Sequence, residues 1–161
     1  MTPTAQRWIE VRDGEQKTRV LYQIALAGAF EPLVRDTATA LARSTSSDLE
    51  RLRRIHRFVR DGVAYFREPV EMFATPTHTL RNGGDCDDHV SLVLALCWAL
   101  RYPIAVEPVG NPLAPSHYTG RAGYPAHDSP AGDARTRWIS LETTIPALFG
   151  EHVTAAARRN P

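Results

Sequence analysis

Apolar residues recur at close to helical spacing through the first part of the chain. Segments 19–30 and 33–42 each carry such a pattern, and Glu31-Pro32 separates them. Periodic apolar positions are typical of a helix with one buried face, and a proline marks a break between two such segments. The pattern therefore predicts two helices.

A third helix is predicted to begin after Ser47. A serine followed by Glu50 three residues later is the capping-box pattern, in which each side chain accepts a hydrogen bond from the other residue's N–H. The pair Asp61-Gly62 is a signal for the end of the helix. The apolar positions between these signals share one face, which we expect to be buried: Leu49, Leu52, Ile55 and Val59.

The most apolar segment of the chain covers residues 90–100. It is apolar nearly all round, which predicts a helix that is buried on most of its sides. Residues 67–84 are polar and contain prolines, so we expect an irregular segment that leads into this helix. Residues 63–66 fit either a short strand or the start of a loop.

Beyond Arg101 the pattern changes from helices to strands. Segments 104–110, 117–124 and 137–144 are rich in residues that favour strands and are bounded by Pro, Gly, Asn and Asp. Helices followed by strands are typical of an α+β domain. We therefore expect N-terminal helices and a central buried helix packed on a small antiparallel β-sheet.

Composition limits the classes of protein that fit. A chain of 161 residues is enough for one domain with a sizeable core, so we expect a single domain over residues 1–161. The net charge of +1 gives no general attraction to nucleic acid or to anionic membranes. No apolar run approaches the roughly 18 residues of a membrane span, and the N-terminus lacks the apolar centre of a secretion signal. We expect a cytoplasmic protein, or one carried in a virion or similar assembly, with no nucleic-acid or membrane partner.

The predicted third helix carries five arginines, which form either a nucleic-acid surface or a solvated face. Because the whole chain is nearly neutral and no aromatic platform accompanies them, we favour the solvated face. These arginines are Arg51, Arg53, Arg54, Arg57 and Arg60.

Cys86 is the strongest candidate for chemistry. The chain has two cysteines, and on one helix Cys86 and Cys97 would lie roughly 16 Å apart, beyond disulfide reach. Cys97 lies inside the apolar run and is expected in the core. Cys86 stands between two glycines and the start of the buried helix. The N–H groups and dipole of a helix N-terminus stabilise a thiolate and can bind an oxyanion, so this position suits a nucleophile.

Three aspartates, Asp85, Asp87 and Asp88, surround Cys86. Their charges oppose thiolate formation, but carboxylates suit a helix N-terminus, where they cap free N–H groups. With His89 and the thiol they also offer the ligand types of a metal site. Because these groups crowd one helical turn, whereas a tetrahedral site draws its ligands from separate elements, we expect no metal.

A catalytic thiol needs a base, and the base needs a group that orients it. His117 opens a strand-like stretch and is the favoured base, while His127, in a loop, stays open as the alternative. Glu142 stands at the middle of the last predicted strand, and adjacent strands would bring it beside His117. The other histidines are expected at structural, surface or cleft-lining positions: His56 on the polar surface, His78 in the irregular segment, His89 in a structural or solvent-facing position and His152 in the tail.

These residues together resemble the transglutaminase-like superfamily of cysteine enzymes, including its compact bacterial and phage-encoded members. The Cys motif of the family corresponds to Gly84-Asp85-Cys86-Asp87, followed by the apolar helix and the turn at 101–104. Its histidine at the start of a strand corresponds to His117-Tyr118. Its tryptophan followed by Asp-x-Thr corresponds to Trp138 with Glu142-Thr143-Thr144, so that glutamate stands where the family usually has aspartate. His127 fits the commoner, shorter spacing to this third motif better than His117.

The resemblance implies a papain-like core over about residues 46–150, with a helical extension over residues 1–45. It implies Cys86, His117 and Glu142 as catalytic residues that cleave an amide through a thioester and pass the acyl group to water or to an amine. Asp87 and Trp138 are expected to contact the substrate, a protein or peptide, and no cofactor is expected. The alternative is a catalytically silent relative that serves as a phage or bacterial assembly or binding protein.

Overall fold

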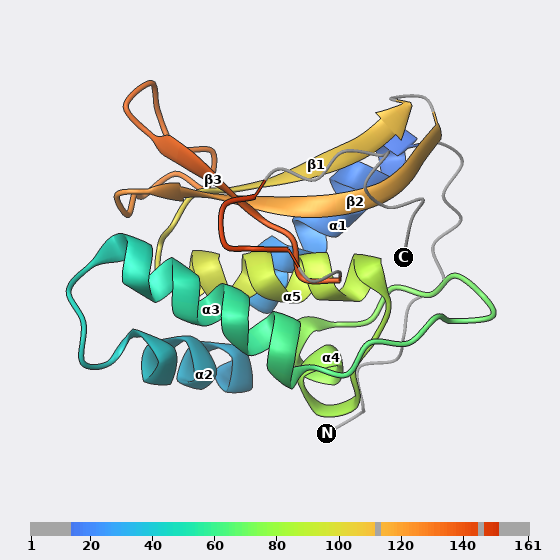
Figure 1. Cartoon of the computed structure of the whole chain (residues 1–161), viewed down its shortest axis with the longest axis horizontal. Coiled ribbons are helices and arrows are strands. Elements are labelled where there is room, and N and C mark those ends of the chain that lie inside the picture. Colours follow the sequence, from blue (N-terminus) through green and yellow to red (C-terminus); the bar gives the residue numbers. More distant parts are fainter. Residues whose placement is uncertain (1–13, 112–113, 145–146, 152–161) are drawn as a thin grey trace.

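The computed structural model describes residues 14–111, 114–144 and 147–151. Within these ranges the chain forms five helices and then three strands (Figure 1). In chain order they are α1 (Gly14–Gly28), α2 (Pro32–Ala42), α3 (Asp48–Gly62), α4 (Pro76–Asn82), α5 (Cys86–Ala99), β1 (Ile104–Asn111), β2 (Ala114–Tyr124) and β3 (Arg137–Leu141). The predicted α+β class is confirmed, and no described helix has the length and apolar character needed to cross a bilayer.

The three strands form one antiparallel sheet with β2 in the middle. Gly120 of β2 lies opposite Val106 of β1 on one side and Leu141 of β3 on the other. The register of β1 and β2 shifts between Val109 and Gly110, where the paired strands are irregular. The sheet forms one layer of the molecule, and the helices form the other (Figure 1).

Helix α5 is the centre of the core. Its residues are buried from Asp87 through Trp98, as its continuous apolar sequence predicts. It packs against the other four helices and against β1 and β2. In Figure 1 it runs directly beneath the sheet, with α3 in front of it, α1 behind it, and α2 and α4 on its far side.

The helix predicted after Ser47 is confirmed as α3, with three differences in detail. The Ser47 hydroxyl accepts a hydrogen bond from the Glu50 N–H at 3.3 Å, but the Ser47 N–H donates to Thr45 Oγ1 and not to Glu50. Only half of the capping box is therefore formed. Leu49 is exposed, and His56, which we expected on the polar surface, takes a place on the buried face with 1% of its surface exposed.

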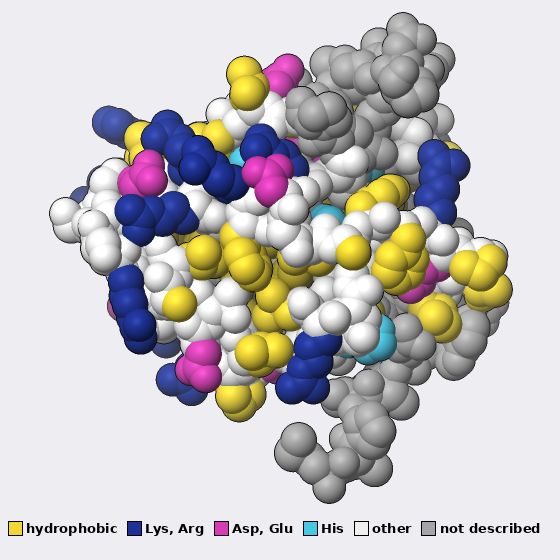
Figure 2. Space-filling view, turned by 60° about the horizontal axis from the view of Figure 1, so that its bottom comes forward, with side chains coloured by type: hydrophobic (Ala, Val, Ile, Leu, Met, Phe, Trp, Pro, Cys, Tyr) yellow, Lys and Arg dark blue, Asp and Glu magenta, His cyan; other side chains and the backbone are white. Residues whose placement is uncertain are grey.

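The arginines of α3 make the local ion pairs expected of a solvated face. Arg53 and Arg54 pair with Glu50, and Arg60 pairs with Asp61. Figure 2 shows basic side chains gathered toward the upper left of one face of the molecule, with acidic side chains among them.

Helix α4 lies within the segment that we expected to be irregular, so that part of the prediction is wrong. Thr75 caps the helix by accepting a hydrogen bond from the His78 N–H at 3.2 Å, and Pro76 follows at the first helical position. Both are recognised signals for a helix start, so the sequence carried the information. Upstream, Tyr65 forms an isolated parallel bridge with Gly84, which attaches the segment after α3 to the residues just before Cys86.

The close approach of β2 to α5 depends on a glycine. A Cβ atom at Gly120 would lie 2.9 Å from Leu94 Cδ2 and 3.4 Å from Val93 Cγ1. A Cβ atom fits here only if the Leu94 side chain shifts. Gly120 therefore fixes how closely the central strand lies on the helix that carries Cys86 at its start.

We expect Gly120→Val to destabilise the protein by about 1–3 kcal/mol, because the added methyl groups overpack the layer between β2 and α5. Chemical denaturation measures this change in the free energy of unfolding. The matched control is Gly62→Ala, whose Cβ would meet only Phe58 Cδ2 at 3.9 Å. A Gly120→Val variant as stable as Gly62→Ala would show that the layer is looser than these distances indicate.

Candidate active site

Cys86 is the first residue of α5, and Asp85 caps the helix. The Asp85 carboxylate accepts hydrogen bonds from the N–H groups of Asp87 at 3.0 Å and of Asp88 at 3.4 Å. Asp88 in return accepts from the Asp85 N–H at 3.3 Å, which completes a capping box. This arrangement confirms for Asp85 and Asp88 that acidic residues beside the thiol cap the helix N-terminus, whereas the Asp87 carboxylate pairs with Lys17.

The capping box also limits the oxyanion site that we expected in the first turn of α5. The N–H groups of Asp87 and Asp88 are occupied by the Asp85 carboxylate. The His89 N–H donates to the Asp85 carbonyl at 3.0 Å, as in a regular helix. These three N–H groups are therefore not available to bind an oxyanion.

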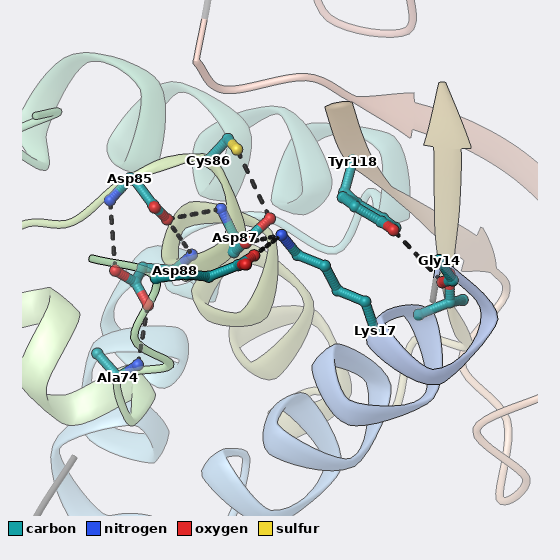
Figure 3. A network of polar contacts seen from close by, with 10 residues as sticks. Gly14, Lys17, Ala74, Asp85, Cys86, Asp87, Asp88 and Tyr118 are labelled. Atoms are coloured by element: carbon teal, nitrogen blue, oxygen red, sulfur yellow. Dashed lines mark hydrogen bonds and ion pairs between the residues drawn. The ribbon is translucent and has the colours of Figure 1, made fainter. Parts of the chain in front are cut away.

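The Asp87 side chain lies between the thiol and a lysine. The Cys86 thiol donates to Asp87 Oδ1 at 3.6 Å, and Lys17 Nζ of α1 lies 2.6 Å from Asp87 Oδ2 (Figure 3). Burial raises the pKa of Asp87, and the charge and hydrogen bond of Lys17 oppose this rise. With only 2% of its surface exposed, Asp87 contacts the nucleophile and Lys17, and we had expected it to contact substrate.

Asp88 faces away from the thiol, toward the segment before α4. Besides the bond from Asp85, its carboxylate accepts a hydrogen bond from the Ala74 N–H at 2.9 Å. Burial raises the pKa of Asp88 to about 7, and the hydrogen bond from Ala74 only partly offsets this. The carboxyl group is therefore only partly ionised at neutral pH, which reduces the negative charge near Cys86.

Ligand atoms of Asp85, Cys86 and Asp87 lie within 4.8 Å of one another, as a metal site would require. The carboxylates, however, already have partners. Asp85 accepts from two backbone N–H groups and Asp87 is paired with the Lys17 ammonium. Because a cation already faces this cluster, we do not identify it as a metal centre.

His117 and Glu142 form a buried pair. His117 Nε2 lies 2.6 Å from Glu142 Oε2, and neither side chain is more than 1% exposed. The other ring nitrogen, His117 Nδ1, is buried and has no hydrogen-bond partner in the part of the chain that the structure describes. The pair thus holds one nitrogen of the imidazole, and the other has no hydrogen-bond partner among the described residues.

Glu142 is held as an ionised carboxylate. Burial alone would raise its pKa, but the hydrogen bond and charge of His117, with two hydrogen bonds from Thr144, lower the pKa of Glu142 to about 2. The Thr144 N–H and hydroxyl both donate to Glu142 Oε1 at 2.7 Å. Each carboxylate oxygen therefore has its own partner, which fixes the orientation of the group.

The register of the sheet explains why these two side chains meet. β3 ends at Leu141, which lies opposite Gly120, so Glu142 stands just beyond the strand and not at its middle as we expected. Continuing this antiparallel register places Glu142 beside Thr119, two residues from His117. Residues two apart on a strand share a face, so the diagonal pair lies within reach.

β2 and α5 also carry His117 and Cys86 toward the same end of the layer. The place where Gly120 packs on Leu94 serves as a common reference point. His117 lies three residues before Gly120 on β2, roughly 10 Å from that point. Cys86 lies eight residues earlier on α5, roughly 12 Å away. At the other end, the Gly123 N–H donates to the carbonyl of Pro103, just past the end of α5, so strand and helix run in the same direction.

The remaining histidines have other partners. His127 lies in the loop after β2, where its Nδ1 accepts from the Ser129 N–H at 2.9 Å and its Nε2 lies 3.6 Å from Asp133. His89 is fully buried, with Nε2 at 3.2 Å from the Ala64 carbonyl, which confirms a structural position. His78 of α4 contacts Asn82 on the same helix. His152 lies outside the described residues.

His56 is the residue near this pair that the sequence analysis missed. Burial lowers the pKa of His56, so it is neutral, and its Nε2–H donates to the backbone carbonyl of Glu142 at 2.6 Å. The bond attaches α3 to the segment that carries the carboxylate. The sequence did contain a signal for its burial. His56 lies one residue after Ile55 and three before Val59, which places it on the apolar face of the helix.

Trp138 lies far from the His117–Glu142 pair. It stands opposite Gly123, six residues along β2 from His117, which is roughly 20 Å. Its side chain lines a hollow of about 390 Å³ together with Tyr22 of α1 and Ile104 of β1, and Arg121 lies over its ring. The structure therefore does not bring Trp138 together with the other residues expected at the site.

Comparison with protein-family models, with curated proteins and with solved structures finds no match for this chain. The transglutaminase-like resemblance therefore stays a prediction that rests on the motifs in the sequence.

The low pKa of Glu142 predicts acid sensitivity. A carboxylate whose pKa falls from 4.5 to about 2 on folding contributes stability above pH 4.5, which is lost as the pH falls toward 2. We expect this group to account for about 3 kcal/mol of the wild-type loss over that range. Denaturant unfolding of wild type and Glu142→Gln between pH 6 and pH 3 measures about 2 kcal/mol of this loss, because the pKa of Glu142 lies below pH 3. The variant should lose less stability than wild type, and parallel curves would contradict the prediction.

Proposed function

We propose that this protein is a cysteine-dependent amide-bond hydrolase or acyltransferase, with Cys86 as the nucleophile. The observation that carries the proposal is the buried His117–Glu142 pair. Its free ring nitrogen belongs to the strand that packs on α5, the helix whose first residue is Cys86. Nucleophilic catalysis by a thiol uses a base that is held by an ionised carboxylate, and a helix N-terminus favours the thiolate.

In the first half of the reaction, His117 takes the thiol proton and Cys86 Sγ attacks the amide carbonyl carbon. A carbon–sulfur bond forms, and the carbon–nitrogen bond then breaks. The proton held by His117 passes to the leaving amine, which departs neutral. Cys86 is left as a thioester of the acyl group.

In the second half, water or a second amine attacks the thioester carbonyl, and the carbon–sulfur bond breaks. His117 accepts the proton of the attacking group and returns one to the thiolate. Water gives hydrolysis, and an amine gives transfer of the acyl group. A peptide or isopeptide amide is the substrate class that we propose, on the strength of the sequence motifs.

The electrostatics of the pair support these roles. Glu142 remains ionised over the whole range in which an imidazole titrates, because the pKa of Glu142 is about 2. Its charge stabilises the imidazolium that forms when His117 takes a proton, and its hydrogen bond holds the ring in one orientation. Glutamate, one methylene longer than aspartate, makes this contact at 2.6 Å.

The two cysteines differ in accessibility, which makes the proposal testable on the thiol itself. Cys86 is half-buried, whereas Cys97 is fully buried in α5 and burial raises the pKa of its thiol. An alkylating reagent should therefore react with Cys86 and leave Cys97 intact while the protein is folded.

We expect alkylation of Cys86 by iodoacetamide at pH 6 to be at least tenfold faster than that of a free thiol with a pKa of about 8.5. His117→Ala should remove this advantage, since the thiolate loses its imidazolium partner. His127→Ala is the matched control, and its rate should stay within about twofold of wild type. Mass spectrometry of the adducts over pH 5 to 9 gives the profile.

Two other results would change the conclusion. Loss of reactivity in His127→Ala and not in His117→Ala would reassign the base. An ordinary thiol profile that neither variant alters would overturn the enzyme proposal and favour a catalytically silent protein with an assembly or binding role.

A further inference from the structure

Lys17 of α1 is the only lysine in the chain, and its side chain is 17% exposed. Its ammonium group lies 2.6 Å from Asp87 Oδ2 and also pairs with Glu71. It stands over two aromatic rings, 5.1 Å from the centroid of Tyr118 and 5.9 Å from that of Phe73. The cation is thus enclosed by partners from β2, from α5 and from the segment before α4.

These contacts reach the candidate nucleophile in two steps. Lys17 holds one oxygen of Asp87, and the other oxygen accepts the hydrogen bond from the Cys86 thiol (Figure 3). The Tyr118 hydroxyl donates to the Gly14 carbonyl at 3.3 Å, which attaches the start of α1 to the strand that carries His117. α1 is therefore part of the surroundings of the thiol, although it lies outside the region that the family motifs cover.

We propose that Lys17 is a positioning residue for Cys86: through Asp87 it orients the thiol, and its positive charge offsets the carboxylate that would otherwise oppose the thiolate. The role in catalysis rests on the function proposed above. The effect on the thiol does not, because it acts on the ionisation of Cys86 whatever reaction follows.

The charges near Cys86 determine how easily its thiolate forms. A carboxylate next to a thiol raises the thiol pKa, and a cation at similar distance lowers it. Lys17 is a cation that pairs with this cluster, in which the acidic groups are Asp85, Asp87, Asp88, Glu68 and Glu71. On the sheet side, β2 carries His117, with its partner Glu142, toward the same end of α5.

Lys17 keeps its charge over the whole range in which a thiol titrates. Burial alone would lower its pKa, but the charges and hydrogen bonds of Asp87 and Glu71 outweigh burial and raise the pKa of Lys17 above its ordinary value. Since the Asp87 side chain is only 3% exposed, solvent and salt screen this pair less than they screen a surface ion pair.

The test is a double-mutant cycle read at Cys86. We expect Lys17→Met to move the midpoint of the alkylation profile up by about one pH unit, because the carboxylate is no longer offset. Asp87→Asn should move it down by a similar amount, because the cation is then unopposed. The double variant should return to within about 0.3 units of wild type, and Lys17→Arg should stay close to it.

Arg19→Met is the matched control. It removes a cation from the same helix, one whose guanidinium is exposed and pairs with Glu15, and it should leave the midpoint unchanged. Cys97 reports folding in the same spectra, since a folded variant leaves it unmodified. If Lys17→Met exposes Cys97, the sign of the Asp87→Asn shift decides: a downward shift supports the proposal, and an upward shift or none overturns it.

The alkylation profiles test the role of Lys17 and the proposed function separately. A profile that His117→Ala leaves unchanged would overturn the enzyme proposal, yet opposite shifts in Lys17→Met and Asp87→Asn would still show that the pair controls the thiol. Single variants that shift the midpoint in the same direction, or only lower the melting temperature, would reduce Lys17 to a purely structural ion pair.

Discussion

The packing of α5 against β2 is the constraint on which the rest of the structure depends. The absence of a side chain at Gly120 lets the strand lie directly on Leu94 and Val93. That contact sets the distance and direction between the start of the helix and the strand that carries His117. Because α5 is buried from Asp87 through Trp98, every other helix packs around it, and the position of Cys86 follows from the core and not from a loop.

The start of α5 concentrates negative charge where a nucleophilic thiolate would have to form, and the fold compensates each acid differently. Asp85 is used by backbone N–H groups, Asp88 accepts two N–H bonds and is partly protonated at neutral pH, and Asp87 is paired with Lys17. Hydrogen bonding, burial and ion pairing therefore each reduce the field at the thiol. An acidic motif around a cysteine is compatible with a reactive thiol only with compensation of this kind.

The sequence allowed most of the local structure to be predicted, because the signals there are local. Ser47 starts α3 and the unbroken apolar run forms α5. α4 was not predicted, although Thr75-Pro76 is a signal for a helix start. The polar, proline-containing composition of the segment favoured an irregular structure instead. The pairing of His117 with Glu142 was anticipated only as a consequence of adjacent strands. Trp138 shows the limit of that reasoning, because its position along the strand, roughly 20 Å from His117, depends on register, which the motif spacing does not encode.

What sequence reasoning could not reach are the contacts between distant segments. His56 and Glu142 are 86 residues apart, and neither the helical pattern of one nor the strand pattern of the other indicates a bond between them. Lys17 is the stronger case. Motif comparison left α1 outside the core, yet its single lysine faces the acidic residue that touches the thiol. An ion pair of this kind is visible only once the layers are assembled, because it joins residues far apart in the sequence, and their attraction offsets the cost of burying both charges. The charged contacts of Asp87 therefore extend the candidate site to Lys17, which lies on the first described helix of the chain.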